Sequence, residues 1–238
     1  IIGEEYLIPL LGKWDSVSDI NFDELPTKYV LKSNTGSGRI IVVSDNQSKD
    51  LIVLKKKLDM WQRIPFGYNG MEIQYLPIVR SIIAEQYIEE MDGNLHDYKF
   101  HCFNGAPALV EFMGERDLVN HTSSEIWCDI NFEPLNIVEK LEGSFANYSG
   151  ECKKPQNYDK MLEIVRTLCK PFMYVRVDLY NLEGKILFGE LTFTPDNGLD
   201  MWEAKDTDEK IGNLLILDVD ARQSEENLLK QVREYFGN

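Results

Sequence analysis

The chain lacks long apolar runs and the marks of a secreted protein. No apolar run approaches the roughly 18–20 residues that cross a bilayer, so the sequence predicts no membrane span. The opening Ile1-Ile2-Gly3 carries neither an initiating Met nor basic residues, so we do not expect it to be a signal peptide. We therefore expect the chain to be part of a longer polypeptide.

Cysteine is scarce, with four residues in 238, and no two of them form a CxxC pair. The spacing of Cys102, Cys128, Cys152 and Cys169 predicts neither a zinc module nor a redox pair. A disulfide framework is not expected in a chain of this length, which favours a reducing compartment. The sequence therefore predicts a cytoplasmic protein.

Positively charged residues are also scarce: the chain has 25 Lys and Arg against 40 Asp and Glu, for a net charge of −15. That balance argues against nucleic acid or an anionic membrane as the main partner, although a local basic cluster can still bind a nucleotide. The chain has no GxSxG elbow, no Walker loop and no Cys/His pair at a catalytic spacing. The chain therefore lacks the common signatures of nucleophilic catalysis and of a P-loop phosphate site.

Strand and helix patterns alternate along a chain that is 43% hydrophobic and 11% aromatic, as in a globular protein with one domain or two joined subdomains. A helix capped by Asn46 or Ser48 is expected to end before Pro65. The other expected elements are strands at 28–33, 40–43, 82–88, 98–103 and 108–112, a hairpin over 174–192, and helices at 158–170 and 223–236. The class is α+β.

The hairpin carries the strongest chemical signal. A turn at 181–184 brings Asp178 and Glu190 roughly opposite each other, with Arg176 on the same face. Close carboxylates suggest a hard cation, and magnesium is usually held by one or two carboxylates and substrate phosphates. A surface hairpin with ordinary charged residues is the alternative.

Two further segments could hold a nucleotide. Lys32 precedes a loop, 34–39, in which Gly36, Ser37 and Gly38 could fold over phosphate oxygens, although a plain hairpin turn also explains the glycines. Glu85, Tyr87 and Ile88 lie where an extended strand leaves a sheet and could read an adenine edge, or could simply precede a solvated acidic run.

Two more groups remain ambiguous on sequence alone. Asp97 and Lys99 lie on one side of a strand, where they could bind a ribose and a phosphate or form a surface salt pair. Arg116 and His121 could contact substrate, but a lone histidine is more often structural.

These groups occur in an order that resembles the ATP-grasp superfamily, and more closely its TupA-like members, which are associated with bacterial teichuronopeptide and surface-polysaccharide biosynthesis. The resemblance runs from about residue 3 to about residue 217. The matching segments are 3–9, 30–34 with 36–38, 97–100, 103–105, 171–172, 175–180 and 189–195. The last segment, Gly-Glu-Leu-Thr-Phe-Thr-Pro, is the most specific.

The resemblance implies two α+β subdomains, 1–88 and 89–238, that enclose ATP. Lys32 would contact the phosphates beneath the lid formed by Gly36, Ser37 and Gly38. The adenine would be held by Glu85 and the backbone of Tyr87 and Ile88, and the ribose by Asp97.

The resemblance also assigns the catalytic floor. Asp178 and Glu190 would ligate magnesium, while Arg176 and Lys99 would stabilise the transferred phosphoryl group. Many ATP-grasp enzymes have Asn where this chain has Thr192, so Thr192 is the weaker expected ligand and Asn197 is a nearby substitute. The region 116–131, with Arg116, His121 and Trp127, is expected to line the acceptor site.

By this resemblance the chain is an ATP- and magnesium-dependent carboxylate–amine ligase that forms an amide through an acyl phosphate, in surface-polysaccharide or capsule biosynthesis. Its expected partners are a carboxylate-bearing sugar or peptide-like acceptor and an amine donor. Two alternatives remain: a kinase acting on a hydroxyl, and a non-catalytic nucleotide-binding module of a larger polysaccharide enzyme.

Overall fold

The computed structural model describes residues 1–36, 38–46, 50–67, 72–88, 96–117, 122–140, 145–147 and 152–237. The chain forms two compact units, Ile8–Glu89 and a larger one of Ile1–Leu7 with Glu90–Asn238. The sequence placed residues 1–7 in the N-terminal subdomain. In the structure they lie in the larger unit, because Ile2 and Tyr6 pack against its core.

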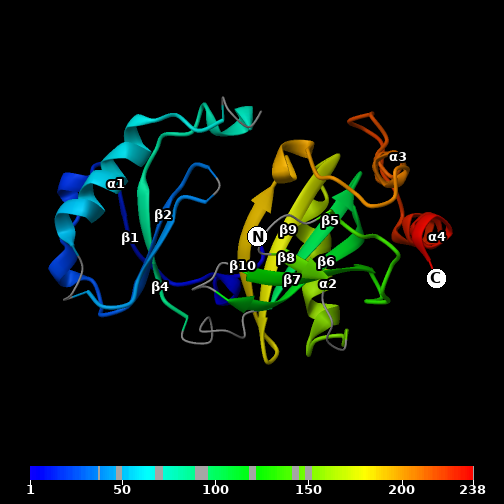
Figure 1. The fold of residues 1–238 in the computed structure, drawn as a ribbon, viewed down its shortest axis with the longest axis horizontal. Coiled ribbons are helices and arrows are strands. Elements are labelled where there is room, and N and C mark those ends of the chain that lie inside the picture. Colours follow the sequence, from blue (N-terminus) through cyan, green and yellow to red (C-terminus); the bar gives the residue numbers. More distant parts are fainter. Residues whose placement is uncertain are drawn as a thin grey trace. The chain divides into compact units, whose positions relative to one another are not determined.

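The smaller unit is a four-stranded antiparallel sheet with one helix against it (Figure 1). Buried residues of the sheet, such as Leu31 and Ile82, pack on Leu58 and Trp61 of the helix. The helix is α1 (Leu51–Arg63), and the strand order β1-β4-β2-β3 comprises β1 (Leu10–Trp14), β4 (Ile82–Gln86), β2 (Tyr29–Ser33) and β3 (Ile40–Val43). Strand β1 was not predicted, because the apolar residues of 1–27 show no clear period.

The start of α1 corrects a prediction. Asp50 caps the helix by accepting hydrogen bonds from the amides of Ile52 and Val53. Asn46 instead donates its side-chain amide to the carbonyls of Phe22 and Leu25. Ser48 lies outside the described residues. Asn46 therefore ties the chain before β2 to the end of β3 and does not cap the helix.

The larger unit contains a six-stranded sheet of order β10-β9-β5-β6-β7-β8, in which the β7–β8 pair is parallel and the other described pairs are antiparallel. The strands are β5 (Asp97–Phe103), β6 (Ala106–Asp117), β7 (Thr122–Asp129), β8 (Phe145–Asn147), β9 (Tyr174–Leu182) and β10 (Lys185–Thr192). Helices are separate from these hairpins, so the expected α+β class is confirmed. Within the described residues, no helix is long and apolar enough to cross a membrane.

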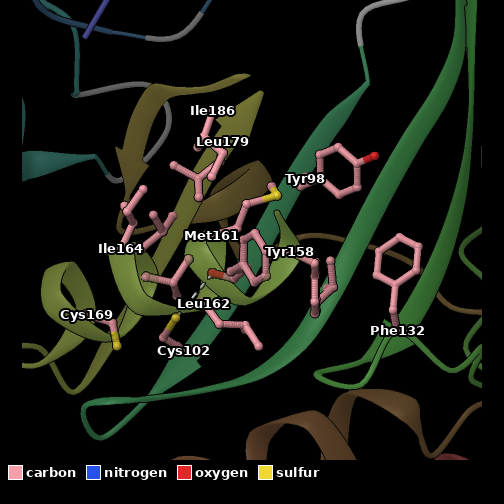
Figure 2. Close-up of a cluster of buried hydrophobic side chains, with 14 of the residues drawn as sticks. Tyr98, Cys102, Phe132, Tyr158, Met161, Leu162, Ile164, Cys169, Leu179 and Ile186 are labelled. Carbon is pink, nitrogen blue, oxygen red and sulfur yellow. Dashed lines mark hydrogen bonds between the residues drawn. The ribbon is translucent and has the colours of Figure 1, made fainter. Parts of the chain in front are cut away.

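Helix α2 (Tyr158–Cys169) covers one face of this sheet (Figure 2). Its residues Met161, Ile164 and Val165 pack on alternate residues of β5 and β9. The chain ends with η6 (Pro195–Gly198), α3 (Thr207–Gly212) and α4 (Glu225–Phe236), and α4 packs against β6 and β7. Because alternate residues of each central strand point into this core, the residues between them point to the opposite face of the sheet.

The β9–β10 hairpin confirms the expected pairing of Asp178 with Glu190. Its turn places Glu183 and Gly184 at φ values of 50° and 97°, as a two-residue hairpin loop requires. The register shifts by one residue between Phe188 and Glu190, so Gly189 forms a β-bulge. Phe188 faces the apolar core, and without the bulge Glu190 would face it too.

We expect Gly189→Ala to destabilise the protein by about 1–2 kcal/mol in urea unfolding, since overpacking forces backbone shifts. An added Cβ would lie 3.1 Å from the carbonyl oxygen of Asp178 and 3.3 Å from the Tyr180 ring. The matched control is Gly212→Ala, whose Cβ would meet nothing within 4 Å. Equal stabilities for the two variants would show that the bulge tolerates a side chain.

Candidate active site

The second face of the six-stranded sheet gathers most of the charged residues predicted to act in chemistry. Strand alternation and the observed register bring Lys99 beside Asp178 and Asp178 beside Glu190 on three neighbouring strands. The residues on this polar face include Asp97, Lys99, His101, Glu111, Arg176, Asp178, Glu190 and Thr192.

Arg176 and Asp178 form a two-pronged ion pair on β9. The Arg176 Nε and Nη2 atoms donate to the two carboxylate oxygens of Asp178 at 2.9 and 2.8 Å. Both side chains are more than nine-tenths buried. Burial raises the pKa of Asp178 to about 7, although the charge of Arg176 opposes that shift. The two hydrogen bonds therefore hold the guanidinium of Arg176 in one orientation on the polar face.

Glu190 and Thr192 extend this pair onto β10. Arg176 Nη2 donates to Thr192 Oγ1 at 3.3 Å and lies 3.5 Å from Glu190 Oε1. The Thr192 hydroxyl donates in turn to Glu190 at 3.2 Å. The Glu190 side chain is 60% exposed, whereas Asp178 is 6% exposed. One carboxylate is therefore locked in the protein and the other is open to solvent.

Lys99 is held by a buried network that the sequence did not reveal. Its Nζ lies 2.5 Å from Glu111 Oε1, while His101 Nε2 lies 3.4 Å from Glu111 Oε2 and His101 Nδ1 lies 2.9 Å from the Tyr174 hydroxyl. Burial lowers the pKa of His101, which favours the neutral imidazole. Burial would also lower the pKa of Lys99, but the negative charges of Glu111, Asp97 and Asp178 together outweigh it, so the net shift is upward.

Three acidic groups near this network carry raised pKa values. Burial, followed by the neighbouring Glu111, raises the pKa of Glu125 to about 7. Burial and the charges of Glu125 and Asp200 raise the pKa of Glu139 to about 8, and Glu125 and Glu139 share a hydrogen bond. Burial raises the pKa of Asp200 to about 6. At neutral pH Glu139 is therefore mostly protonated and Glu125 partly protonated, whereas both would be ionised in the unfolded chain.

We expect Glu139→Gln to raise stability at about pH 8–9 by about 1–2 kcal/mol, with little effect near pH 5. A carboxyl whose folded pKa exceeds its unfolded value makes the protein less stable as pH rises between the two values. That window runs from the ordinary glutamate range up to about 8 for Glu139. Urea unfolding across pH measures it, and a wild-type stability that rises through this window would contradict the argument.

The remaining polar-face predictions have mixed outcomes. Asp97 is buried at the start of β5, and its neighbour Tyr98 points into the opposite core, as the alternation predicted. Trp127, expected near the acceptor, is 4% exposed and packs against His101 with ring centroids 4.8 Å apart. Arg116 lies in β6, but its side chain, like all of His121, is outside the described residues.

In the smaller unit the structure joins two predicted nucleotide contacts directly. Lys32 Nζ lies 2.6 Å from Glu85 Oε2, across the β2–β4 pair. Both side chains lie on the face opposite α1, because alternate residues such as Leu31 and Ala84 point into the core. Exposed Ile40 and Val42 share that open face. This face thus presents an ion pair with apolar side chains beside it, and Lys13 lies on the same face.

The glycine loop is anchored at its base. Ser33 donates its amide to the carbonyl of Arg39, and the Asn34 side chain binds the backbone of Val79 and Ser81. Gly36 has a φ of 97°, and a Cβ there would lie 2.5 Å from the Phe66 ring. The loop therefore needs glycine at this position for both conformation and space.

The other residues of this group have less distinct placements. Gly38 has a φ of 69° and open space around it, and Ser37 is outside the described residues. Tyr87 and Ile88 are buried after β4, and Lys28 Nζ lies 5.3 Å from the centroid of the Tyr87 ring.

The oxygen donors of the hairpin fit a hard cation in their chemistry. Asp178, Glu190 and Thr192 are carboxylate or hydroxyl donors on adjoining strands. Asn197 lies exposed in η6. Among the described residues, no three His, Cys, Asp or Glu side chains are arranged as a metal site. A bound magnesium would therefore need oxygens from another molecule, such as the phosphates it usually contacts.

Several solved ligases are similar in structure to this chain. They are an L-amino acid ligase from Bacillus licheniformis (13% identity, TM-score 0.44, 82% of this chain and 41% of that one) and D-alanine–D-alanine ligase from Bacillus anthracis with ATP (14%, 0.41, 96% and 60%). A third is the ligase PsnB with a precursor variant, Mg and ADP (9%, 0.41, 95% and 53%). The chain thus spans about two-fifths to three-fifths of their lengths.

Sequence comparison gives the family. No curated protein gives a significant match to this chain. The family model described as TupA-like ATP-grasp matches residues 1–216 of the 238. That match includes the strands that carry Lys32 and Glu85 and those that carry Lys99, Arg176, Asp178 and Glu190. The chain belongs to the TupA-like ATP-grasp family.

Proposed function

We propose that the protein is an ATP- and magnesium-dependent ligase that joins a carboxylate to an amine. The observation that carries this proposal is the buried Arg176–Asp178 pair, flanked by Lys99 on one strand and Glu190 on the other. Fixed cations beside an open carboxylate suit phosphoryl transfer, in which positioning and charge stabilisation supply most of the catalysis.

The two cations have different parts in this proposal. Arg176 is held by Asp178, so its guanidinium is already oriented when a phosphoryl group arrives. Lys99 is held by Glu111 and keeps its proton despite burial. Together they would offset the charge that develops on the transferred group. No protein nucleophile is required, because the substrate carboxylate attacks.

Asp178, Glu190 and Thr192 are the proposed magnesium ligands. When bound, magnesium would neutralise phosphate charge and orient the phosphates for transfer. Glu190 is the accessible member of the set, and its contacts with Thr192 and Arg176 fix its direction. Asp178 would share its oxygens between the metal and Arg176.

The smaller unit would supply the nucleotide contacts. The Lys32 ammonium and the anchored loop with Gly36, Ser37 and Gly38 would bind phosphates. Glu85, Tyr87 and Ile88 would hold the adenine, and Asp97 the ribose. The apolar surface around the Lys32–Glu85 pair supports a planar base as the neighbour of these charges.

The substrates follow from the family rather than from any one side chain. ATP would convert a carboxylate, such as a uronic acid or a peptide-like acid, into an acyl phosphate, and an amine would displace phosphate to form the amide. Arg116, His121 and Trp127 are the proposed acceptor-side residues. We place the reaction in the cytoplasm, in bacterial surface-polysaccharide or capsule biosynthesis.

Hydroxylamine trapping tests the proposal. The chain, or the longer polypeptide that contains it, is incubated with magnesium, ATP, hydroxylamine and one acid at a time from a set with glucuronate, galacturonate and glutamate. A ligase should release ADP and phosphate and give a hydroxamate with its acid. A stable phosphoester with no hydroxamate would instead identify a kinase.

A further inference from the structure

Two cysteines that lie far apart in sequence meet in the larger unit. The Sγ atoms of Cys128, at the end of β7, and Cys152, which precedes α2, are 3.3 Å apart. The sequence predicted no redox pair, because 24 positions separate the two residues. The contact arises because the core of the larger unit draws the segment before α2 against β7, where both thiols join the same apolar cluster.

The two thiols differ in access. Cys128 is fully buried, whereas Cys152 is partly exposed. The hydrogen bond with Cys128 lowers the pKa of Cys152, while the same contact raises that of Cys128. A partly exposed thiol with thiolate character and a second thiol in contact is the arrangement in which oxidants act selectively.

Neighbouring contacts hold the pair in place. The Tyr158 hydroxyl donates to the carbonyl of Ile130, just beyond β7. The carbonyl of Gln156 accepts from the Asn181 side chain, and the Asn157 side chain donates to the carbonyl of Gly184. The segment carrying Cys152 is therefore fixed four residues later, so a bond between the sulfurs requires only a short local movement to about 2.05 Å.

We propose that Cys128 and Cys152 form an intramolecular disulfide when the protein meets a hydroperoxide. In the first step the Cys152 thiolate attacks the peroxide, which is reduced to water or an alcohol as the sulfur becomes a sulfenic acid. In the second step the Cys128 sulfur attacks that sulfenic sulfur, and the hydroxyl leaves with the Cys128 proton as water. Two thiols are oxidised and one peroxide is reduced.

The bond would link β7 to the start of α2. Strand β7 also carries Glu125 and Trp127 on the polar face, so its position bears on the site described above. Closing this loop constrains the unfolded chain, and we expect a rise in melting temperature of about 5–10 °C that dithiothreitol reverses.

The test needs only the wild-type chain, reduced and then treated with equimolar hydrogen peroxide. We expect the intact mass to fall by about 2 Da and the free thiols to fall from four to two. Non-reducing peptide mapping should link Cys128 to Cys152. Cys102 and Cys169, buried in the core of Figure 2, serve as the internal control and should stay reduced.

The variant Cys152→Ser supplies the second arm, since a partly exposed thiol should be replaceable without loss of the fold. Peroxide treatment of this variant should not produce the loss of about 2 Da that marks the intramolecular disulfide. Four unchanged thiols in wild type, a sulfinic acid on Cys152 without a crosslink, a disulfide between two chains, or a link that joins Cys102 to Cys169 would each overturn the proposal.

Discussion

Arg176→Met is expected to lower the free energy of unfolding by about 3–5 kcal/mol near pH 7, because it leaves a buried carboxylate without its partner. Asp178 is 6% exposed and loses both hydrogen bonds from the guanidinium. The loss should shrink as the pH falls below about 7, because burial raises the pKa of Asp178 and lets it take up a proton. ATP-dependent turnover should fall at least about 100-fold, as on removal of a transition-state cation.

A double variant separates the two effects. Arg176→Met with Asp178→Asn removes both charges, so it should regain at least half of the lost stability while remaining inactive. Urea unfolding and ATP consumption measure the two quantities on the same samples. If Arg176→Met alone is within 1 kcal/mol of wild type, the pair is not the buried structural unit described here.

Glu190→Gln should have the opposite profile. The Glu190 side chain is 60% exposed, so stability should change by less than about 0.5 kcal/mol. If Glu190 ligates magnesium, ATP consumption should fall by about 100-fold at fixed magnesium and recover in part as magnesium is raised. The matched control is Glu163→Gln on α2, a similarly exposed glutamate that should leave magnesium dependence unchanged.

Equal magnesium dependence in Glu190→Gln and wild type would remove Glu190 from the metal set. A large loss of stability in the same variant would assign it a structural role instead.

The hairpin was readable from sequence because its information is local. Alternating apolar residues indicated which side chains of β9 point into the core, and Asn181 through Gly184 indicated the turn. The bulge at Gly189 was not expected, although it decides which face Glu190 takes. A glycine inside a strand pattern is a known sign of a bulge. Pairing the strands residue by residue from the turn would have shown that Glu190 reaches the polar face only if one extra residue is inserted.

The support of Lys99 was not readable because it comes from three strands. Glu111 lies in the apolar run Ala108–Phe112 and His101 between apolar neighbours, and nothing local indicates that they meet. A charged residue inside a buried strand does signal an unknown partner, and here that partner is Lys99. The same limit explains β1, whose short irregular sequence becomes a strand by pairing with β4.

Manganese binding tests the central proposal most directly, because Mn²⁺ replaces Mg²⁺ at oxygen sites and is visible by electron paramagnetic resonance. With a non-hydrolysable ATP analogue, wild type and Glu163→Gln should bind the manganese–nucleotide complex equally. Asp178→Asn with Glu190→Gln should weaken that binding at least about tenfold. Unchanged affinity in this double variant would contradict a metal–nucleotide site at the β9–β10 hairpin.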